Sequence, residues 1–444
     1  MKNVKLISTL SVILLSVCTM FGQTYQEYKT PTIVRSSFDL LLQATGSYEK
    51  QRTDYYKTNS HAFAAGPEFA FVTYKETSSS FTNHTFLLGA EFGKYRSKEK
   101  SRGSTDRLKA NTTEVAAAYS LTKRFYFEKN AFFGTGGGLT LQYENYNLRG
   151  SDYSNKNTLF QAMLPLEVGS GRLKHVTEVY QAAYLLKELA KKNALKRELT
   201  TDEELALAQV MATAKNKRFL NSGKLLTEEV AVVDSFLQAK NLLTDDGSAY
   251  TTTLNNVWKT SALFERRAGT VFSAGMNTYY HYMEAEEWKE ETDGDAFSFN
   301  PFLLFQYEKP MNLRWQHSIA VSPNAMFTKM DNIKNRYFAL EAMYQLGFYP
   351  TQRTNINLAV AGKLLSGKQI PSNPDRWNPS KKITETSIGI SLTGSHYITP
   401  HLRVTAQING SFDHQKQRPN GTYTDYKTNL TKANYVIAFA YVLY

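Results

Sequence analysis

The sequence predicts an antiparallel all-β transmembrane barrel of about 14 strands, with a small α-helical insert between strands 6 and 7. Three observations predict it. Apolar and polar residues alternate along most of the chain, and Tyr (28) and Phe (26) are abundant although the mean hydropathy is −0.43. One block, residues 169–209, has helical patterning instead. Beyond residue 22 no segment approaches the roughly 18 apolar residues of a membrane-spanning helix, so a chain that stays in a membrane must close its strands.

The first 22 residues have the pattern of a secretory signal peptide. Two lysines precede an apolar run from Leu6 to about Val17, and cleavage is expected after Gly22. A membrane anchor is the alternative, but the run is shorter than the roughly 18 residues needed to span. Cys18 is the only cysteine, and Val17 stands where a lipoprotein signal needs a small residue. The mature chain is therefore expected to have neither a disulfide nor a thiolate metal site.

The barrel strands are expected in two halves of the chain, residues 23–168 and residues 266–444. In the clearest example, Leu402 and Val404 share one face of a strand while Arg403 and Thr405 share the other. Strands are predicted near residues 36–47, 61–75, 84–97, 112–123, 131–145, 157–168, 268–283, 296–308, 313–328, 337–348, 355–364, 387–398, 401–412 and 431–444.

The connections between these strands favour a membrane barrel over a soluble β-sandwich. Counted from a periplasmic N-terminus, even-numbered connections such as residues 121–125 are short, whereas odd-numbered ones such as residues 97–110 are long and polar. Short periplasmic turns, long outer loops and aromatic residues at strand ends are typical of outer-membrane barrels. The last strand is apolar on both faces and ends on Tyr444, which resembles the assembly signal of such barrels.

The helical insert is expected over residues 169–265 and, as the sixth connection, in the periplasm. Hydroxyl N-caps followed by carboxylates are expected at Thr177, at Thr200 or Thr201, and at Thr227. The first two thirds of the insert are basic, which indicates either a solvated helix surface or docking on an acidic protein, a cell-wall polymer or lipid headgroups. The candidate docking residues are Arg172, Lys191, Lys192, Lys217 and Arg218.

The signal peptide, barrel and insert together resemble uncharacterised outer-membrane proteins of the Bacteroidota that carry a helical block within the barrel sequence. The resemblance is strongest in the insert, at Gly169, Gly171, Arg172 and the KNKRF motif of Lys215 to Phe219. The resemblance implies an outer-membrane location and a barrel architecture, but it implies no particular activity.

Ionisable side chains on the polar face are expected to line the barrel lumen. They either pair across a plugged interior or line a water-filled channel, where they set a charge preference. The candidate lumen-lining residues are Glu68, Glu91, Glu341, Arg314, Lys363 and Arg403.

Neither an enzyme nor a cofactor is expected, since no catalytic or metal-binding motif stands out. Ser273, Asn277 and His281 share one strand face, but residues four apart on a strand lie about 13 Å apart and cannot form a catalytic relay. The formal charge of +12 favours anionic lipid or polymer over nucleic acid as a partner. Lipopolysaccharide phosphates are expected at the basic outer-loop residues Lys98, Lys100, Arg102, Arg107 and Lys109.

Two functions are compatible with these features. The first is a porin-like channel or solute transporter, favoured because about 14 strands enclose more space than side chains alone usually fill. The alternative is a non-conducting structural or interaction barrel, whose insert docks a periplasmic partner or the cell wall.

Overall fold

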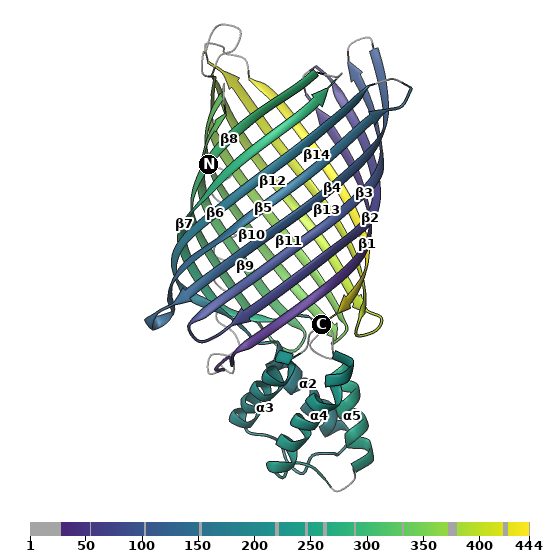
Figure 1. Cartoon of the computed structure of the whole chain (residues 1–444), viewed down its shortest axis with the longest axis vertical. Coiled ribbons are helices and arrows are strands. Elements are labelled where there is room, and N and C mark those ends of the chain that lie inside the picture. Colours follow the sequence, from purple (N-terminus) through teal and green to yellow (C-terminus); the bar gives the residue numbers. More distant parts are fainter. Residues whose placement is uncertain are drawn as a thin grey trace, which may run out of the picture.

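Fourteen strands close into one barrel in the computed structural model, which describes residues 28–443 apart from 54, 102–103, 151–152, 218–221, 245–246, 261–263, 288–289, 331–332, 372–379 and 421–424. Each strand pairs antiparallel with its sequence neighbour, and β1 closes on β14 (Figure 1). This confirms the predicted fold class and strand number. The strands are β1 (Ile33–Arg52), β2 (Lys57–Glu76), β3 (Ser80–Ser101), β4 (Ser104–Tyr126), β5 (Ala131–Leu148), β6 (Ser154–His175), β7 (Arg267–Glu287), β8 (Glu290–Pro310), β9 (Trp315–Met330), β10 (Ile333–Thr351), β11 (Thr354–Pro371), β12 (Lys381–Tyr397), β13 (Leu402–Pro419) and β14 (Tyr426–Leu443). The predicted signal peptide, Cys18 and Tyr444 lie outside the described residues.

The strands are longer than their alternation predicts. We call the barrel end that carries the helices the helix end, and the opposite end the loop end. At the loop end, β3 runs to Ser101 and β4 starts at Ser104, so the long loop predicted at residues 97–110 is wrong. Lys98 still pairs with Arg107 there. The backbone ladder continues beyond the apolar belt, where side chains no longer need to alternate in hydropathy.

The barrel wall has an apolar outer face. On β14, Ile437 and Phe439 point outward and are 45% and 49% exposed, whereas Ala438 and Ala440 point inward and are 8% and 2% exposed. This strand alternates in residue size rather than in polarity, so hydropathy alone could not assign its faces. Large apolar side chains exposed on every side of the barrel match a hydrocarbon surrounding. Those more than half exposed include Leu42, Phe63, Phe92, Val168, Phe338, Ile388 and Ile408.

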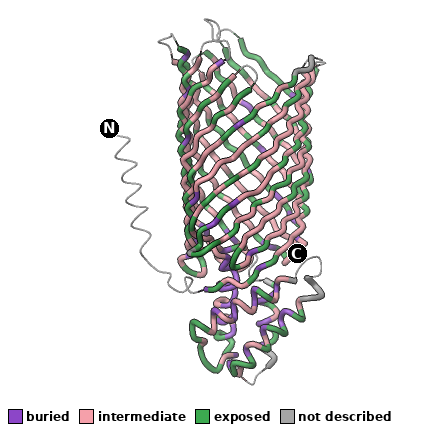
Figure 2. The backbone as a smooth tube through the Cα atoms, turned by 60° about the vertical axis from the view of Figure 1, so that its left-hand side comes forward, coloured by how far each residue is buried: buried purple, intermediate pink, exposed green. Residues whose placement is uncertain are grey.

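A compact helical domain lies at one end of the barrel and has the main apolar core of the chain (Figure 2). It consists of α2 (Thr177–Lys191), α3 (Thr201–Ala214), α4 (Ser222–Ala239) and α5 (Gly247–Thr260), with the short 3-10 helix η3 (Lys215–Lys217) after α3. Leu185, Leu207, Met211, Leu237 and Trp258 are almost fully buried between these helices. None of the helices in the described part of the chain is long and apolar enough to cross a membrane.

Several predicted helix boundaries need correction. β6 continues to His175, so the helical interpretation of residues 169–175 is wrong. Thr200 caps α3 and forms the predicted capping box with Glu203. Thr177 does not cap α2, because its hydroxyl instead accepts the backbone N–H of Arg266 at 2.9 Å. Thr227 lies inside α4, which starts five residues earlier at Ser222.

Candidate functional site

Four carboxylates follow one another around the inner face of β2 to β5, and we call them the acidic wall: Glu68, Glu91, Glu114 and Glu144. Glu91 stands directly opposite Glu114, which stands directly opposite Glu144. Gln43 on β1 donates to Glu68 at 3.3 Å and to Glu91 at 2.9 Å. A side chain that reaches from β1 past β2 to β3 lies on the concave face, where side chains converge. The acidic wall therefore faces the lumen.

The acidic wall has no cationic partner among the described residues. Its other polar contact is Gln142, which donates to Glu114 at 3.1 Å and to Glu144 at 2.7 Å. Amide donors relieve some of the repulsion between carboxylates but do not neutralise their charge. No cluster of described His, Cys, Asp and Glu side chains has a metal-binding arrangement. The wall is thus a negatively charged stretch of lumen surface.

The predicted lumen cations lie on other strands, each close to a carboxylate. Lys363 Nζ lies 3.5 Å from Glu385 Oε1, and Glu341 is the register partner of Lys363 on β10. Arg403 lies 3.7 Å from Asp39 Oδ2 on β1. Lys363 and Glu341 line two cavities of about 360 and 410 Å³ on the lumen side of the wall. Their positive charge is therefore largely compensated by acids.

One predicted lumen residue lies elsewhere. Arg314 precedes β9 and is exposed in the turn between β8 and β9. It is therefore not one of the strand residues that point into the lumen, and its assignment to the lumen wall is corrected. The predicted strand began at residue 313, whereas the turn extends to Arg314. The structure places the other five predicted residues on strands: Glu68, Glu91, Glu341, Lys363 and Arg403.

The chain crosses the helix end of the lumen where α5 leads into β7. Phe264 packs against Tyr397 of β12 with Ala440 and Val442 of β14, and its ring centroid lies 5.3 Å from that of Tyr397. It also lies 6.4 Å from the ring of Tyr349 on β10. In the ring of strands, β14 stands opposite β7. A residue three positions before β7 whose ring contacts β10 and β12 must reach across the mouth.

The last residues of β6 bend in the same direction. Gly171 on β6 and Gly269 on the neighbouring β7 have φ values of +94° and +138°. A Cβ added to either glycine would lie 2.1 Å from a carbonyl oxygen of the other strand. Only glycine adopts this backbone without strain. Beyond the bend, the ring of His175 lies 5.8 Å from that of Tyr74 on β2. We call residues 172–175 together with residues 264–267 the lumen floor.

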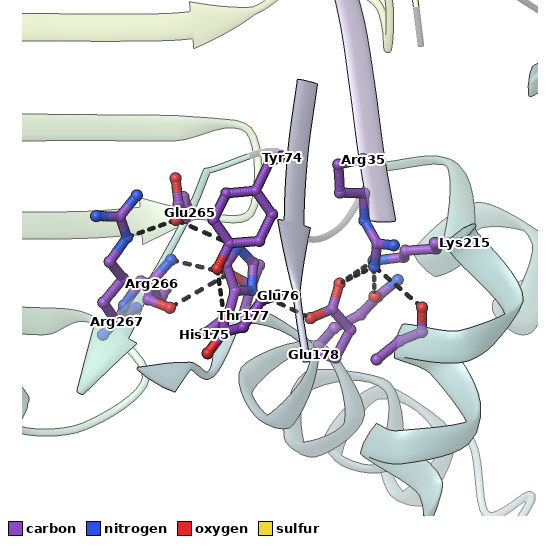
Figure 3. A network of polar contacts seen from close by, with 12 residues as sticks. Arg35, Tyr74, Glu76, His175, Thr177, Glu178, Lys215, Glu265, Arg266 and Arg267 are labelled. Carbon is purple, nitrogen blue, oxygen red and sulfur yellow. Dashed lines mark hydrogen bonds and ion pairs between the residues drawn. The ribbon is translucent and has the colours of Figure 1, made fainter. Parts of the chain in front are cut away.

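An ionic junction fixes the helical domain to this floor (Figure 3). Glu178 on α2, whose side chain is 3% exposed, lies 3.2 Å from Arg35 of β1, 3.3 Å from Lys215 of η3 and 3.5 Å from His175. Burial alone would raise the pKa of Glu178, but Lys215, His175 and Arg35 outweigh it and hold that pKa well below its usual range. The carboxylate stays charged, and it links three separate segments.

Arg266 connects the floor to the turn between β8 and β9. Its guanidinium donates to the carbonyl oxygens of Asn312, Leu313 and Trp315 at 2.9–3.1 Å. It also lies 4.1 Å from the ring centroids of both Tyr180 and Tyr349. Arg266 is 4% exposed, so these carbonyl and aromatic contacts help to stabilise a buried cation.

The predicted docking residues do not form one surface. Arg172 is largely buried, bonds Glu76 at 2.9 Å and lies 4.5 Å from the ring centroid of Tyr126, so it is a floor residue and its docking role is corrected. Lys191 pairs with Glu188 at 2.6 Å, whereas Lys192 is exposed at the end of α2. The side chain of Lys217 and all of Arg218 lie outside the described part of the chain.

Sequence reasoning missed Phe264, Arg266 and Glu178. Each looks ordinary in the chain: one aromatic residue after a helix, one arginine and one first-turn glutamate. Their roles depend on contacts with residues more than 30 positions away, such as Tyr397, Trp315 and Lys215. The available signal for this part of the chain was the pair Gly169 and Gly171, because glycine in a strand often marks a bend.

No family model and no curated protein matches this sequence. Solved structures similar to it include the P. putida toluene transporter TodX, with 9% identity, coverage of 91% of this chain and 89% of that chain, and a TM-score of 0.36. They also include Pseudomonas aeruginosa OccK7 (OpdD), with 10% identity, coverage of 92% and 100%, and a TM-score of 0.28. The translocator domain of the autotransporter NalP from Neisseria meningitidis has 7% identity, coverage of 98% and 97%, and a TM-score of 0.27. At such identities and TM-scores, the function of this chain has to be inferred from its own residues.

Proposed function

We propose that the protein is an outer-membrane channel for small hydrophilic solutes that favours cations, with its helix end in the periplasm. The observation that carries this is the acidic wall, four lumen carboxylates without a cationic partner among the described residues. Uncompensated carboxylates raise the local concentration of cations and lower that of anions. The apolar outer face supports the membrane placement.

The lumen floor gives the proposed channel its narrow section. Phe264 and the residues around it stand across the periplasmic mouth, so solutes pass the charged wall first and then a restricted exit. The floor favours small solutes, and charge selects among them.

Planar-bilayer recordings test the proposal. The purified protein should give discrete conductance steps and a reversal potential that indicates cation preference. Glu114→Gln combined with Glu144→Gln should lower the cation-to-anion permeability ratio by about twofold at low salt, where charges are least screened. The matched control, Glu204→Gln combined with Glu228→Gln on the helical domain, removes the same charge and should leave the ratio unchanged. A conducting but unselective wild-type protein would refute the cation preference.

The second candidate is a non-conducting barrel that presents the helical domain to a periplasmic partner or to the cell wall. The ionic junction favours it, because a domain tied to three segments is held in a fixed orientation. A folded protein that is silent in bilayers, even when Phe264 is replaced by Ala, would support this function over the channel.

A further inference from the structure

A row of cations runs along the outer surface of the barrel at the loop end. Arg336 on β10 is the register partner of Lys368 on β11, which is the partner of Lys382 on β12, which is the partner of Arg418 on β13. All four residues are exposed. We call them the cation row.

The parity of the strands shows that the cation row faces outward. Because successive side chains of a strand point to opposite faces, Arg336 lies on the same face as Phe338, and Lys382 lies on the same face as Ile388. Phe338 and Ile388 are 59% and 58% exposed on the outer face. Residues of the opposite parity, such as Glu341 on β10, line the lumen cavities. The row therefore lies directly beyond the apolar belt, at the depth of lipid headgroups.

This arrangement is unfavourable for the protein alone. Like charges directly opposite each other on neighbouring strands destabilise a sheet. Arg418 is compensated by Asp425 at 2.6 Å. For Arg336, Lys368 and Lys382 no carboxylate lies within ion-pair distance among the residues that the structure describes. An anion from outside the chain would remove this repulsion.

An apolar pocket adjoins the row. A cavity of about 430 Å³ opens on the outer face of β8 to β10, and it is lined by Phe297, Phe299 and Phe327 together with Arg336. Its edge carries a second pair of opposed cations, Lys329 and Lys334, which are register partners on β9 and β10. Cations and aromatic rings that line the same pocket match a ligand with an anionic head and an apolar tail.

We propose that the cation row and this pocket form a binding site for a phosphorylated lipid of the outer leaflet. The phosphates lie on Arg336, Lys368 and Lys382, where a guanidinium can bind phosphate oxygens in a bidentate manner. An acyl chain lies against Phe297, Phe299 and Phe327. The site depends on the proposed membrane orientation but not on conduction, since every residue in it faces away from the lumen.

Native mass spectrometry of the protein in dodecyl maltoside tests the site, with bis-phosphorylated lipid A as the probe. The variant Arg336→Gln/Lys368→Gln/Lys382→Gln should bind this lipid at least about tenfold more weakly, since three charge-assisted contacts are lost. The control Lys187→Gln/Lys192→Gln/Lys240→Gln removes the same charge from the helical domain and should bind like the wild type. Lys368→Arg/Lys382→Arg should retain binding, and heat-modifiable gel migration verifies that each barrel is folded.

Three results would overturn the assignment. Equal binding of lipid A and its dephosphorylated form would show that the phosphates are not recognised. Unchanged binding by the folded triple variant would place the lipid elsewhere. Displacement of the lipid by millimolar inorganic phosphate would indicate a free-phosphate site. Bilayer conductance, measured separately, should be the same in the triple variant and in the wild type, so failure of this site and failure of the channel are distinguishable.

Discussion

Phe264 shows how one side chain can set the properties of the lumen. It is half-buried, and its ring contacts residues of β10 and β12 although it belongs to the connection before β7. Edge-on aromatic contacts of this kind contribute about 0.5–1.5 kcal/mol each beyond their buried area. These contacts hold the ring in place at the helix end of the lumen.

Replacing Phe264 with Ala should increase single-channel conductance, because it removes the ring from the narrow section. The loss in stability should be smaller than the roughly 3–5 kcal/mol of a fully buried Phe, since the ring is only half-buried. Conductance in planar bilayers measures the effect, with Phe338→Ala on the outer face as the control of equal size. Unchanged conductance in the Phe264 variant would show that the floor is not the narrow section.

At the scale of elements, the ends of β6 and β7 and the start of α2 behave as one unit. The backbone N–H of Val176 donates to the carbonyl oxygen of Arg266 at 2.9 Å, which continues the β6–β7 pairing into the helical domain. Glu178 then attaches α2 to β1 through Arg35 and to η3 through Lys215. Removing one partner of a buried ion pair typically costs about 3–5 kcal/mol, so this junction is a strong tether.

The helical domain should loosen from the barrel in acid. The pKa of Glu178 is lowered in the folded protein by Lys215, His175 and Arg35, which outweigh burial. A carboxylate of this kind contributes stability at pH values above its unfolded pKa of about 4.3, and the contribution is lost as the pH falls through and below that value. The helical melting temperature, followed by far-UV circular dichroism, should therefore drop between about pH 5 and pH 3.

Glu178→Gln is the matched control for this pH dependence. The variant should melt at a lower temperature at neutral pH, because Lys215, His175 and Arg35 lose a buried carboxylate, and its melting temperature should depend less on pH. A variant with the same acid sensitivity as the wild type would assign that sensitivity to other carboxylates.

At the scale of the whole molecule, two clusters of like charge lie on opposite faces of the barrel wall. The acidic wall faces the lumen, while the cation row and the pair Lys329 and Lys334 face outward at the loop end. The barrel of this basic chain, whose formal charge is +12, thus has a patch that attracts cations on its inner face and a patch that attracts anions on its outer face.

Cysteine labelling in intact cells tests the proposed orientation. A cysteine at Lys100, exposed near the end of β3, should react with a membrane-impermeant maleimide. A cysteine at Lys192, exposed at the end of α2, should react only after the outer membrane is permeabilised. The mature chain is expected to lack cysteine, which gives a clean background. Labelling of the Lys192 variant in intact cells would show that the barrel has the opposite orientation. The cation row would then not lie at the outer leaflet, and the proposed lipid site would be refuted as well.

The sequence alone determined the class of architecture, because period-two alternation and helical periodicity are local properties that each segment expresses on its own. It predicted the barrel, the fourteen strands and the position of the insert between strands 6 and 7. It also predicted the capping box at Thr200 and Glu203, which spans four residues. Where hydropathy stopped alternating, as at residues 97–110 and on β14, local pattern no longer reported strand ends or faces.

The tertiary structure alone decided what lies at the mouth of the barrel and which charges are compensated. Phe264 belongs to the floor only because the closed ring brings Tyr349 of β10 and Tyr397 of β12 within its reach. Arg172 is buried rather than available for docking because the bend at Gly171 turns it toward Glu76 and Tyr126. The cation row exists only in the strand register, which aligns residues 32, 14 and 36 positions apart. Barrel closure and register couple distant segments through hydrogen bonds and packing, and no local pattern encodes those couplings.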